Sequence, residues 1–189
     1  MKYSCEPTRL IIGERNLFRE HVTIHRSNTP SEDTRIGSEN FFMANSHVGH
    51  NSIIGNKAIL ANGVLIAGHA MIGDGAFLAG NAVVHQFCRV GAMAMMQGCA
   101  GVSLDLPPFT IVRGINGMCG LNSVGLKRAG FSPEERSQLK KAYHAIFLSD
   151  DLLKDALEKA RAEFTGVLAE QLIDFVATSQ RGTCSHTKR

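Results

Sequence analysis

Histidine is the residue type in this chain whose number and spacing could support chemistry. Four of the eight histidines fall between residues 47 and 85, and a fifth, His25, is one of the two that precede them. These five are His25, His47, His50, His69 and His85. An imidazole ordinarily titrates near pH 6.5, so in its neutral form it can act as a general base or bind a metal such as zinc. Between His47 and His85 the only acidic residue is Asp74, so carboxylate chemistry is not expected there.

A repeat of six residues must position these histidines. From residue 36 to residue 107, every sixth residue is large and apolar, and Gly, Ala or Ser usually follows it. The openers are Ile36, Phe42, Val48, Ile54, Leu60, Ile66, Ile72, Leu78, Val84, Val90, Met96 and Val102. A period of six fits neither an α-helix nor a plain strand. It is typical of a parallel β-helix, in which three units close one triangular coil.

The repeat also extends toward the N-terminus. Ile12, Phe18 and Ile24 fall on multiples of six, and the polar residues 26–35 then interrupt the pattern before Ile36 resumes it in phase. Such an insertion, with Pro30 inside it, predicts an outward loop from one corner, and loops of this kind commonly carry function.

The period predicts which histidines share an edge. Units 18 residues apart stack on one side of the prism, about 4.8 Å apart, so His50, His69 and His85 are expected on the same side. His47 lies at the corner just before His50. We expect His25 to stack with the unit that opens at Phe42, near the same edge. Polar residues at solenoid corners can simply be solvated, but that interpretation is weaker for a cluster than for one histidine.

Two chemistries compete for such a cluster. Hexapeptide-repeat carbonic anhydrases bind zinc through histidines five residues apart in one chain, and no histidine pair here has that spacing. The acidic helpers of such a site are also missing. A neutral imidazole acting as a general base toward a hydroxyl group fits the sequence better, so no metal is expected.

Composition limits the class of protein. The chain has 189 residues, 44% of them hydrophobic, and no apolar run approaches the roughly 20 residues of a membrane span. Residues 1–5 have no signal-peptide core, which predicts a cytoplasmic protein. The cysteines are odd in number and form no C-x-x-C pair, so neither a disulfide framework nor a four-cysteine zinc site is expected. A net charge of +3 is too small to indicate nucleic-acid binding.

The periodicity changes after the repeat ends. Ser132, Pro133 and Glu135 predict a capped helix start, and apolar spacing predicts further helices over about residues 150–164 and 167–179. Residues 182–189 are expected to fray.

We therefore divide the chain into a β-helix over residues 1–115 and a helical domain over residues 116–189. Because the prism sides carry apolar residues, we expect identical subunits to pack side by side, as threefold oligomers do.

Several sequence runs together resemble the UDP-N-acetylglucosamine 3-O-acyltransferases, which catalyse the first acyl transfer of lipid A biosynthesis. They are EPTR (residues 6–9), TIHR (23–26), NSHVGHN (45–51), LIAGH (65–69), VHQFC (84–88), LPPF (106–109) and GLKRAGFS (125–132). The match covers nearly the whole chain in order. It implies a left-handed parallel β-helix with a C-terminal α-helical region, although parallel crossovers are right-handed in nearly all folds. It further implies a homotrimer with active sites between subunits, acyl carrier protein as 3-hydroxyacyl donor, UDP-N-acetylglucosamine as acceptor and no cofactor.

The resemblance also assigns roles to residues. The catalytic base falls on His50 and the oxyanion-binding backbone N–H on Gly68. The substrate-contacting positions fall on Lys2, His47, His69, His85 and Gln86, the uridine-nucleotide site on Asn122 and Arg128, and the position that measures the acyl chain on Gly98. Structural alternatives exist for three of these. Gly68 could be required by a positive φ, Gly98 could be a packing glycine, and Arg128 could be simply solvated.

The chain departs from the family pattern in places that matter. Asn51 stands where the family commonly has an aspartate, and an amide can orient an imidazole but stabilises its charged form less well. Val124 and Ala129 replace an acid and an arginine of the nucleotide site, and the chain starts several coils later than usual. These departures leave open a related sugar-nucleotide substrate, such as a 3-amino analogue, or a non-catalytic hexapeptide-repeat scaffold.

Overall fold

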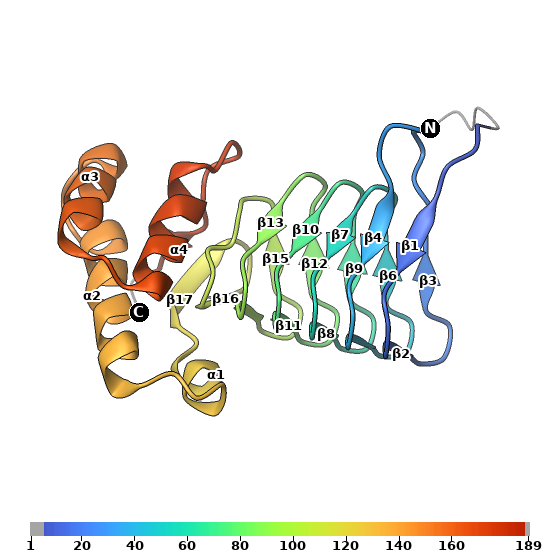
Figure 1. Cartoon of the computed structure of the whole chain (residues 1–189), viewed down its shortest axis with the longest axis horizontal. Coiled ribbons are helices and arrows are strands. Elements are labelled where there is room, and N and C mark those ends of the chain that lie inside the picture. The colour runs from blue at the N-terminus through green and yellow to red at the C-terminus, as the bar shows by residue number, and fades with distance from the viewer. Residues whose placement is uncertain (1–5, 188–189) are drawn as a thin grey trace.

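Three stacks of short strands form the sides of a triangular prism, which we call sheets A, B and C (Figure 1). The computed structural model describes residues 6–187, so Lys2 lies outside the described residues. Sheet A contains β1 (Leu10–Ile12), β4 (Thr34–Ile36), β7 (Ile53–Ile54), β10 (Met71–Ile72) and β13 (Arg89–Val90). Sheet C contains β3 (Thr23–Ile24), β6 (His47–Val48), β9 (Leu65–Ile66), β12 (Val83–Val84) and β15 (Gly101–Val102).

Sheet B is the longest of the three. It contains β2 (Leu17–Phe18), β5 (Phe41–Phe42), β8 (Ile59–Leu60), β11 (Phe77–Leu78), β14 (Met95–Met96), β16 (Thr110–Arg113), β17 (Gly117–Leu121) and β18 (Ser185–His186). Within the prism, neighbouring strands of each sheet are parallel, and units 18 residues apart pair in register, for example Val48 with Ile66. The predicted parallel β-helix is confirmed.

The residues that open each unit fill the inside of the prism. Phe42, Val48, Leu60, Ile66 and Val84 are fully buried, and the same is true of most other openers. A strand of two residues has too few side chains to form a core alone, so each coil depends on the coils above and below it. The chain of stacked openers is therefore the main hydrophobic core.

The corners of the prism need backbone in the left-handed region. The residue three places after an opener has positive φ at one corner after another, and Asn or Gly often occupies that place. At the edge between sheets C and A it is occupied by Asn51 (φ 60°), His69 (φ 58°) and Phe87 (φ 64°). Non-glycine residues in this region cost roughly 1–3 kcal/mol each and tend to collect at functional sites. The other two edges also contain non-glycine residues with positive φ, for example Lys57 and Cys99, so this backbone conformation does not by itself distinguish the C–A edge.

The first coil is longer than the others. Thr23 and Ile24 pair with His47 and Val48, a separation of 24 residues instead of the regular 18. The loop in residues 26–35 adds the six extra residues without changing the phase of the repeat. Our expectation that the unit of His25 stacks with the unit of Phe42 is therefore wrong, and His25 lies directly beside His47 on sheet C.

Four helices follow the β-helix and lie at one end of the molecule (Figure 1). They are α1 (Ser123–Arg128), α2 (Pro133–Phe147), α3 (Leu153–Glu163) and α4 (Val167–Ala177). The capping box of Ser132 and Glu135 is present, and α2 packs against both α3 and α4. Helix α1 was not expected. The predicted boundary between residues 115 and 116 falls between β16 and β17, which pair with each other, and the two-domain division stays a prediction.

The C-terminal tail docks on the end of the β-helix. β18 pairs with β17, the Cys184 N–H donates to Asp105 O at 2.8 Å, and Cys184 is fully buried. The expectation that the tail frays is wrong for residues 182–187, because these backbone hydrogen bonds extend sheet B. None of the helices in residues 6–187 is long and apolar enough to cross a membrane.

Candidate active site

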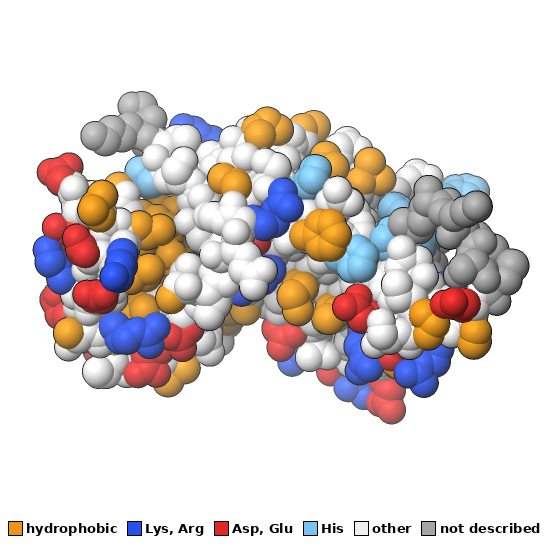
Figure 2. All heavy atoms as spheres, turned by 90° about the horizontal axis from the view of Figure 1, so that it is seen from above, with side chains coloured by type: hydrophobic (Ala, Val, Ile, Leu, Met, Phe, Trp, Pro, Cys, Tyr) orange, Lys and Arg blue, Asp and Glu red, His pale blue; other side chains and the backbone are white. Residues whose placement is uncertain are grey.

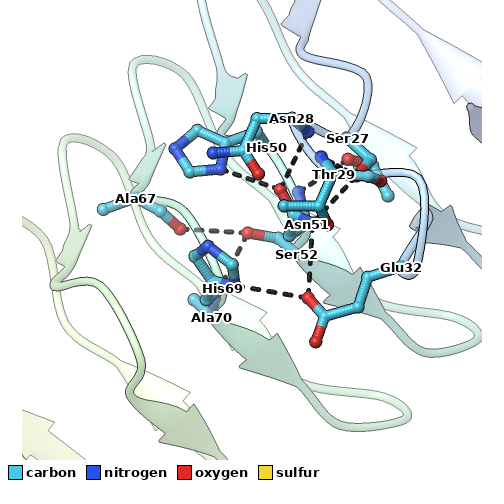
Figure 3. A network of polar contacts seen from close by, with 11 residues as sticks. Ser27, Asn28, Thr29, Glu32, His50, Asn51, Ser52, Ala67, His69 and Ala70 are labelled. Carbon is cyan, nitrogen blue, oxygen red and sulfur yellow. Dashed lines mark hydrogen bonds and ion pairs between the residues drawn. The ribbon is translucent and has the colours of Figure 1, made fainter. Parts of the chain in front are cut away.

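The histidines gather along the edge where sheet C turns into sheet A. His47 lies in β6, His50 and Asn51 follow that strand, and His69 lies one coil further along. Figure 2 shows histidine side chains next to exposed hydrophobic ones over the β-helix. The loop in residues 26–35 leaves the first coil at the same edge and lies over Asn51 (Figure 3).

The partners of Asn51 determine which ring nitrogen of His50 carries the hydrogen. Asn51 Oδ1 accepts from the Asn28 N–H at 3.1 Å, and Asn51 Nδ2 donates to Ser27 Oγ at 2.8 Å. His50 Nδ1 lies 2.9 Å from the same Oδ1, and since a carbonyl oxygen can only accept, Nδ1 must carry the hydrogen. The neutral His50 ring therefore has its lone pair on Nε2, which is the tautomer a general base needs.

Gly68 makes room for the His50 ring. A Cβ atom at position 68 would lie 2.7 Å from both Cε1 and Nε2 of His50, closer than any side chain tolerates. Gly68 is not among the residues with positive φ, so the alternative that its backbone conformation requires glycine is wrong. Within residues 6–187, no acceptor is hydrogen-bonded to the Gly68 N–H. An available backbone donor thus lies next to the Nε2 side of the base.

His47 and His25 form a second pair on sheet C. Their ring centroids are 4.6 Å apart, and Thr23 Oγ1 lies 2.8 Å from His47 Nδ1. Burial lowers the pKa of His47 below its ordinary value, and the neighbouring His25 lowers that pKa further. His47 is therefore neutral at physiological pH and can bind a hydroxyl or amide group as a neutral hydrogen-bonding partner.

His69 connects the base to an acid and an aromatic ring. Its ring packs edge-on against His50, with centroids 5.1 Å apart, and stacks on Phe87 at 4.7 Å. His69 Nδ1 lies 3.6 Å from Glu32 Oε2. One coil further along, His85 and Gln86 are exposed, and His85 Nδ1 lies 3.2 Å from the Gln86 carbonyl oxygen. The structure therefore brings His47, His50, Gly68, His69, His85 and Gln86 together on one edge.

Sequence reasoning missed two residues of this edge, Glu32 and Phe87. The scarcity of acids between His47 and His85, where Asp74 is alone, suggested that no carboxylate is near, but Glu32 reaches His69 from the loop. The six-residue insertion was the available signal, because it leaves the prism at the corner where the histidines stack. Among residues 6–187, no group of three or more His, Cys, Asp and Glu side chains is arranged to hold a metal ion.

Three of the predicted residues lie away from the C–A edge. Gly98 is exposed between sheets B and C, and a Cβ there would lie 3.6 Å from Gly80 O, an ordinary contact. Packing within this chain therefore does not require glycine at position 98. Asn122 caps α1 by accepting from the Gly125 N–H, and its Nδ2 donates to the carbonyl oxygen of Met93, which lies between sheets A and B. Arg128 is exposed at the end of α1.

Comparison with known proteins gives consistent matches. Residues 105–184 match the model described as "Udp N-acetylglucosamine O-acyltransferase; Domain 2", and residues 33–68 match the bacterial transferase hexapeptide repeats. The chain is 44% identical over 186 residues to the acyl-[acyl-carrier-protein]–UDP-N-acetylglucosamine O-acyltransferase of Anaeromyxobacter sp. (strain Fw109-5), covering 96% of this chain and 72% of that protein. It is 45% identical to the protein of the same name from Alkalilimnicola ehrlichii, covering 96% and 71%.

A solved structure gives the same result. The UDP-N-acetylglucosamine acyltransferase of Francisella novicida superimposes with a TM-score of 0.90 at 35% identity, covering 100% of this chain and 71% of that one. The fold it shares with this chain is the left-handed parallel β-helix with C-terminal helices.

Proposed function

This chain belongs to the UDP-N-acetylglucosamine O-acyltransferase family, and we propose that it transfers a 3-hydroxyacyl group from acyl carrier protein to the 3-hydroxyl of UDP-N-acetylglucosamine, with His50 as the general base. This is the first acyl transfer of lipid A biosynthesis. The observation that carries the proposal is the His50 ring, whose Nδ1 contacts Asn51 Oδ1 at 2.9 Å and whose Nε2 faces Gly68.

The proposed reaction is a direct acyl transfer. His50 Nε2 takes the proton of the sugar 3-hydroxyl while that oxygen attacks the thioester carbonyl carbon. The carbonyl oxygen becomes an oxyanion, which the Gly68 N–H stabilises. The tetrahedral intermediate then collapses, the carbon–sulfur bond breaks, and the departing sulfur takes the proton from His50. Atoms and charges balance without a metal or a cofactor.

The other residues of the edge would hold the substrates. His47, His69, His85 and Gln86 present imidazole and amide groups in the coil of the base and in the two coils that follow it, and we propose that they contact the sugar nucleotide. Lys2 stays a predicted contact. Gly98 is exposed and a Cβ there would make only an ordinary contact with Gly80 O at 3.6 Å, which supports its proposed role in setting the length of the acyl chain. Asn122 and Arg128 remain the proposed nucleotide site, with Asn122 also needed for capping α1.

The arrangement of these groups supports a trimer. The base lies on the C–A edge, Gly98 on the B–C edge, and Asn122 next to the A–B edge, so one prism cannot present all of them to one substrate. Side-by-side packing of three prisms would place different edges of neighbouring copies together. We therefore propose that each active site forms between two subunits. The cytoplasmic location stays a prediction.

A transfer assay tests the proposal. Purified protein is mixed with UDP-N-acetylglucosamine, or its 3-amino analogue, and acyl carrier proteins loaded with 3-hydroxyacyl groups of graded length. Since general-base catalysis is typically worth about 10²–10⁴ in rate, His50→Ala should lose roughly that factor while its thermal unfolding is unchanged, and His47→Ala should lose less. Equal product formation by wild type and folded His50→Ala would remove His50 from the mechanism. No product with any donor would favour the non-catalytic scaffold.

A further inference from the structure

Glu32 contacts two imidazoles of the edge, His69 directly and His50 through the Asn51 amide. Its Oε2 accepts from Asn51 Nδ2 at 3.3 Å and lies 3.6 Å from His69 Nδ1. Asn51 in turn contacts His50 Nδ1 through Oδ1. Figure 3 shows this chain of contacts from Glu32 to His69 and, through Asn51, to His50.

The two residues that follow Glu32 in the loop are anchored by polar contacts. The buried Asp33 carboxylate pairs with Arg9 at 2.9 Å and with Arg35 at 3.0 Å, and the hydrogen bond from Arg9 is the main cause that lowers the Asp33 pKa. The buried Thr34 accepts from the Asn51 N–H at 2.7 Å. Glu32 itself is exposed, and these neighbours anchor its backbone, while the contacts to Asn51 Nδ2 at 3.3 Å and His69 Nδ1 at 3.6 Å position its carboxylate.

We propose that Glu32 is a positioning residue whose negative charge orients His50 and His69 for the proposed acyl transfer. The inference rests on the proposed function, which supplies the reaction that His50 performs. The inference goes beyond the proposed function because it assigns a charge near the base to Glu32, which lies 18 positions before His50, on the inserted loop.

The charge acts where the base gains a proton. When His50 takes the hydroxyl proton, its ring becomes positive, and the neutral Asn51 amide can only supply a dipole. The Glu32 carboxylate holds Nδ2 of that amide, which turns Oδ1 toward His50 Nδ1 and places a negative charge behind it. The same carboxylate favours a hydrogen on His69 Nδ1, which fixes the orientation of the His69 ring against His50.

Glu32→Gln separates charge from shape, because glutamine can still accept from Asn51 Nδ2. We expect kcat to fall about tenfold with KM nearly unchanged, a part of the whole general-base effect. Glu32→Asp should retain more activity than Glu32→Gln despite its shorter side chain. Glu163→Gln at the end of α3 removes an exposed charge at the opposite end of the molecule from β4 and β6 (Figure 1) and should leave kcat at the wild-type value. If Glu32→Gln keeps the wild-type kcat, the charge has no role.

Moving the charge gives a sharper test. Asn51→Asp alone would place two carboxylates in contact, at the 3.3 Å now spanned by the hydrogen bond, and should lower kcat. In the double variant Glu32→Gln/Asn51→Asp, a single carboxylate again faces this network, now directly on His50 Nδ1, and kcat should recover above both single variants. If the loss of kcat in the double variant equals the product of the losses in the two single variants, the two positions do not share one charge and the proposal is contradicted.

Ring-nitrogen NMR of protein labelled with ¹⁵N-histidine provides a readout that does not need turnover. In wild type we expect His50 to be protonated on Nδ1, and in Glu32→Gln a changed His69 signal, because the carboxylate no longer faces His69 Nδ1. If wild type transfers acyl groups and His50→Ala does not, unchanged kcat and spectra in Glu32→Gln overturn only the role of Glu32. If no donor gives product, the proposed function fails, and the spectra alone decide whether Glu32 orients the rings.

Discussion

The His50 ring is held by contacts on three sides, and each contact constrains a different property. Asn51 selects the tautomer through Nδ1, Gly68 sets how closely the ring approaches the backbone, and His69 packs against the ring edge at a centroid distance of 5.1 Å. None of these contacts uses the Nε2 lone pair. A base that is oriented in this way loses little rotational freedom when substrate binds, so the geometry itself contributes to the rate.

Gly68→Ala tests whether that approach matters. A methyl group at position 68 would push the His50 ring away, and with it the distance between the base and the Gly68 N–H would change. Since loss of an oxyanion donor typically costs about 10²–10³ in rate, we expect a loss of that order in kcat in the transfer assay. Gly80→Ala is the matched control, because its Cβ would make only a 3.6 Å contact with Asn62 O. Equal kcat in the two variants would show that the room at Gly68 has no catalytic importance.

His47 gives a prediction for stability. Its pKa in the folded protein is lowered, first by burial and then by His25, so the unfolded chain takes up a proton first as the pH falls. The free energy of unfolding should therefore decrease as the pH drops below about 6.5, until the folded protein is protonated as well. Urea unfolding at several pH values measures this slope.

Two variants identify the cause of that slope. His47→Asn removes the titrating group and should flatten the dependence, whereas His25→Asn removes only the smaller cause and should flatten it less. A slope that His47→Asn leaves unchanged would mean that other groups dominate the acid sensitivity of the fold.

At the scale of elements, the repeat made most of the β-helix predictable because each six-residue unit forms the same local structure. The stacking of His50 on the coil of His69 follows directly from a spacing near 18. The position of His25 did not follow, since the loop adds six residues and leaves the phase intact. The contact between Glu32 and His69 depends on the path of that loop, which no periodicity encodes. Helix α1 has six residues, too few for an apolar pattern to reveal it.

The docked tail is the element that sequence patterns described least well. Residues 182–187 have no apolar periodicity, yet they contribute β18 and bury Cys184 against the end of the prism. The hydroxyl of Tyr143 on α2 lies 2.7 Å from His186 Nδ1, so the tail also connects the helices to sheet B. Backbone pairing and a few specific contacts hold it, which is why composition alone suggested fraying.

Thiol reactivity measures how tightly that tail is docked. Burial is the largest cause that raises the pKa of Cys184 to about 12, so its reactive thiolate is scarce at neutral pH. Cys99 is exposed and serves as the internal control. In peptide mapping by mass spectrometry after brief iodoacetamide treatment, Cys99 should be alkylated much faster than Cys184, and urea should abolish the difference. Rapid labelling of Cys184 in the native protein would mean that the tail detaches readily.

At the scale of the whole molecule, the sides of the prism expose apolar side chains that this chain alone does not cover. Leu65 and Val83 on sheet C are 47% and 44% exposed, and Phe87 at the neighbouring corner is 51% exposed. These apolar side chains lie directly beside the histidines, so a partner that covered them would also close the site against water. A neighbouring copy of the same chain would bring an A–B or B–C edge to this place, and with it Arg128 or Gly98.

Mixed trimers test whether two chains share one site. We expect His50→Ala and Arg128→Ala each to reduce transfer, and each to sediment at three times the chain mass of 20.5 kDa. When the two variants are unfolded together and refolded as mixtures, a site that takes His50 from one copy and Arg128 from its neighbour is intact in about a quarter of random cases. Activity should therefore rise toward about a quarter of wild type. Mixing His50→Ala with Gly68→Ala is the control: these residues share an edge of one chain, so mixing regenerates no intact site. Recovery in the control, or none with Arg128→Ala, would contradict a site formed between subunits.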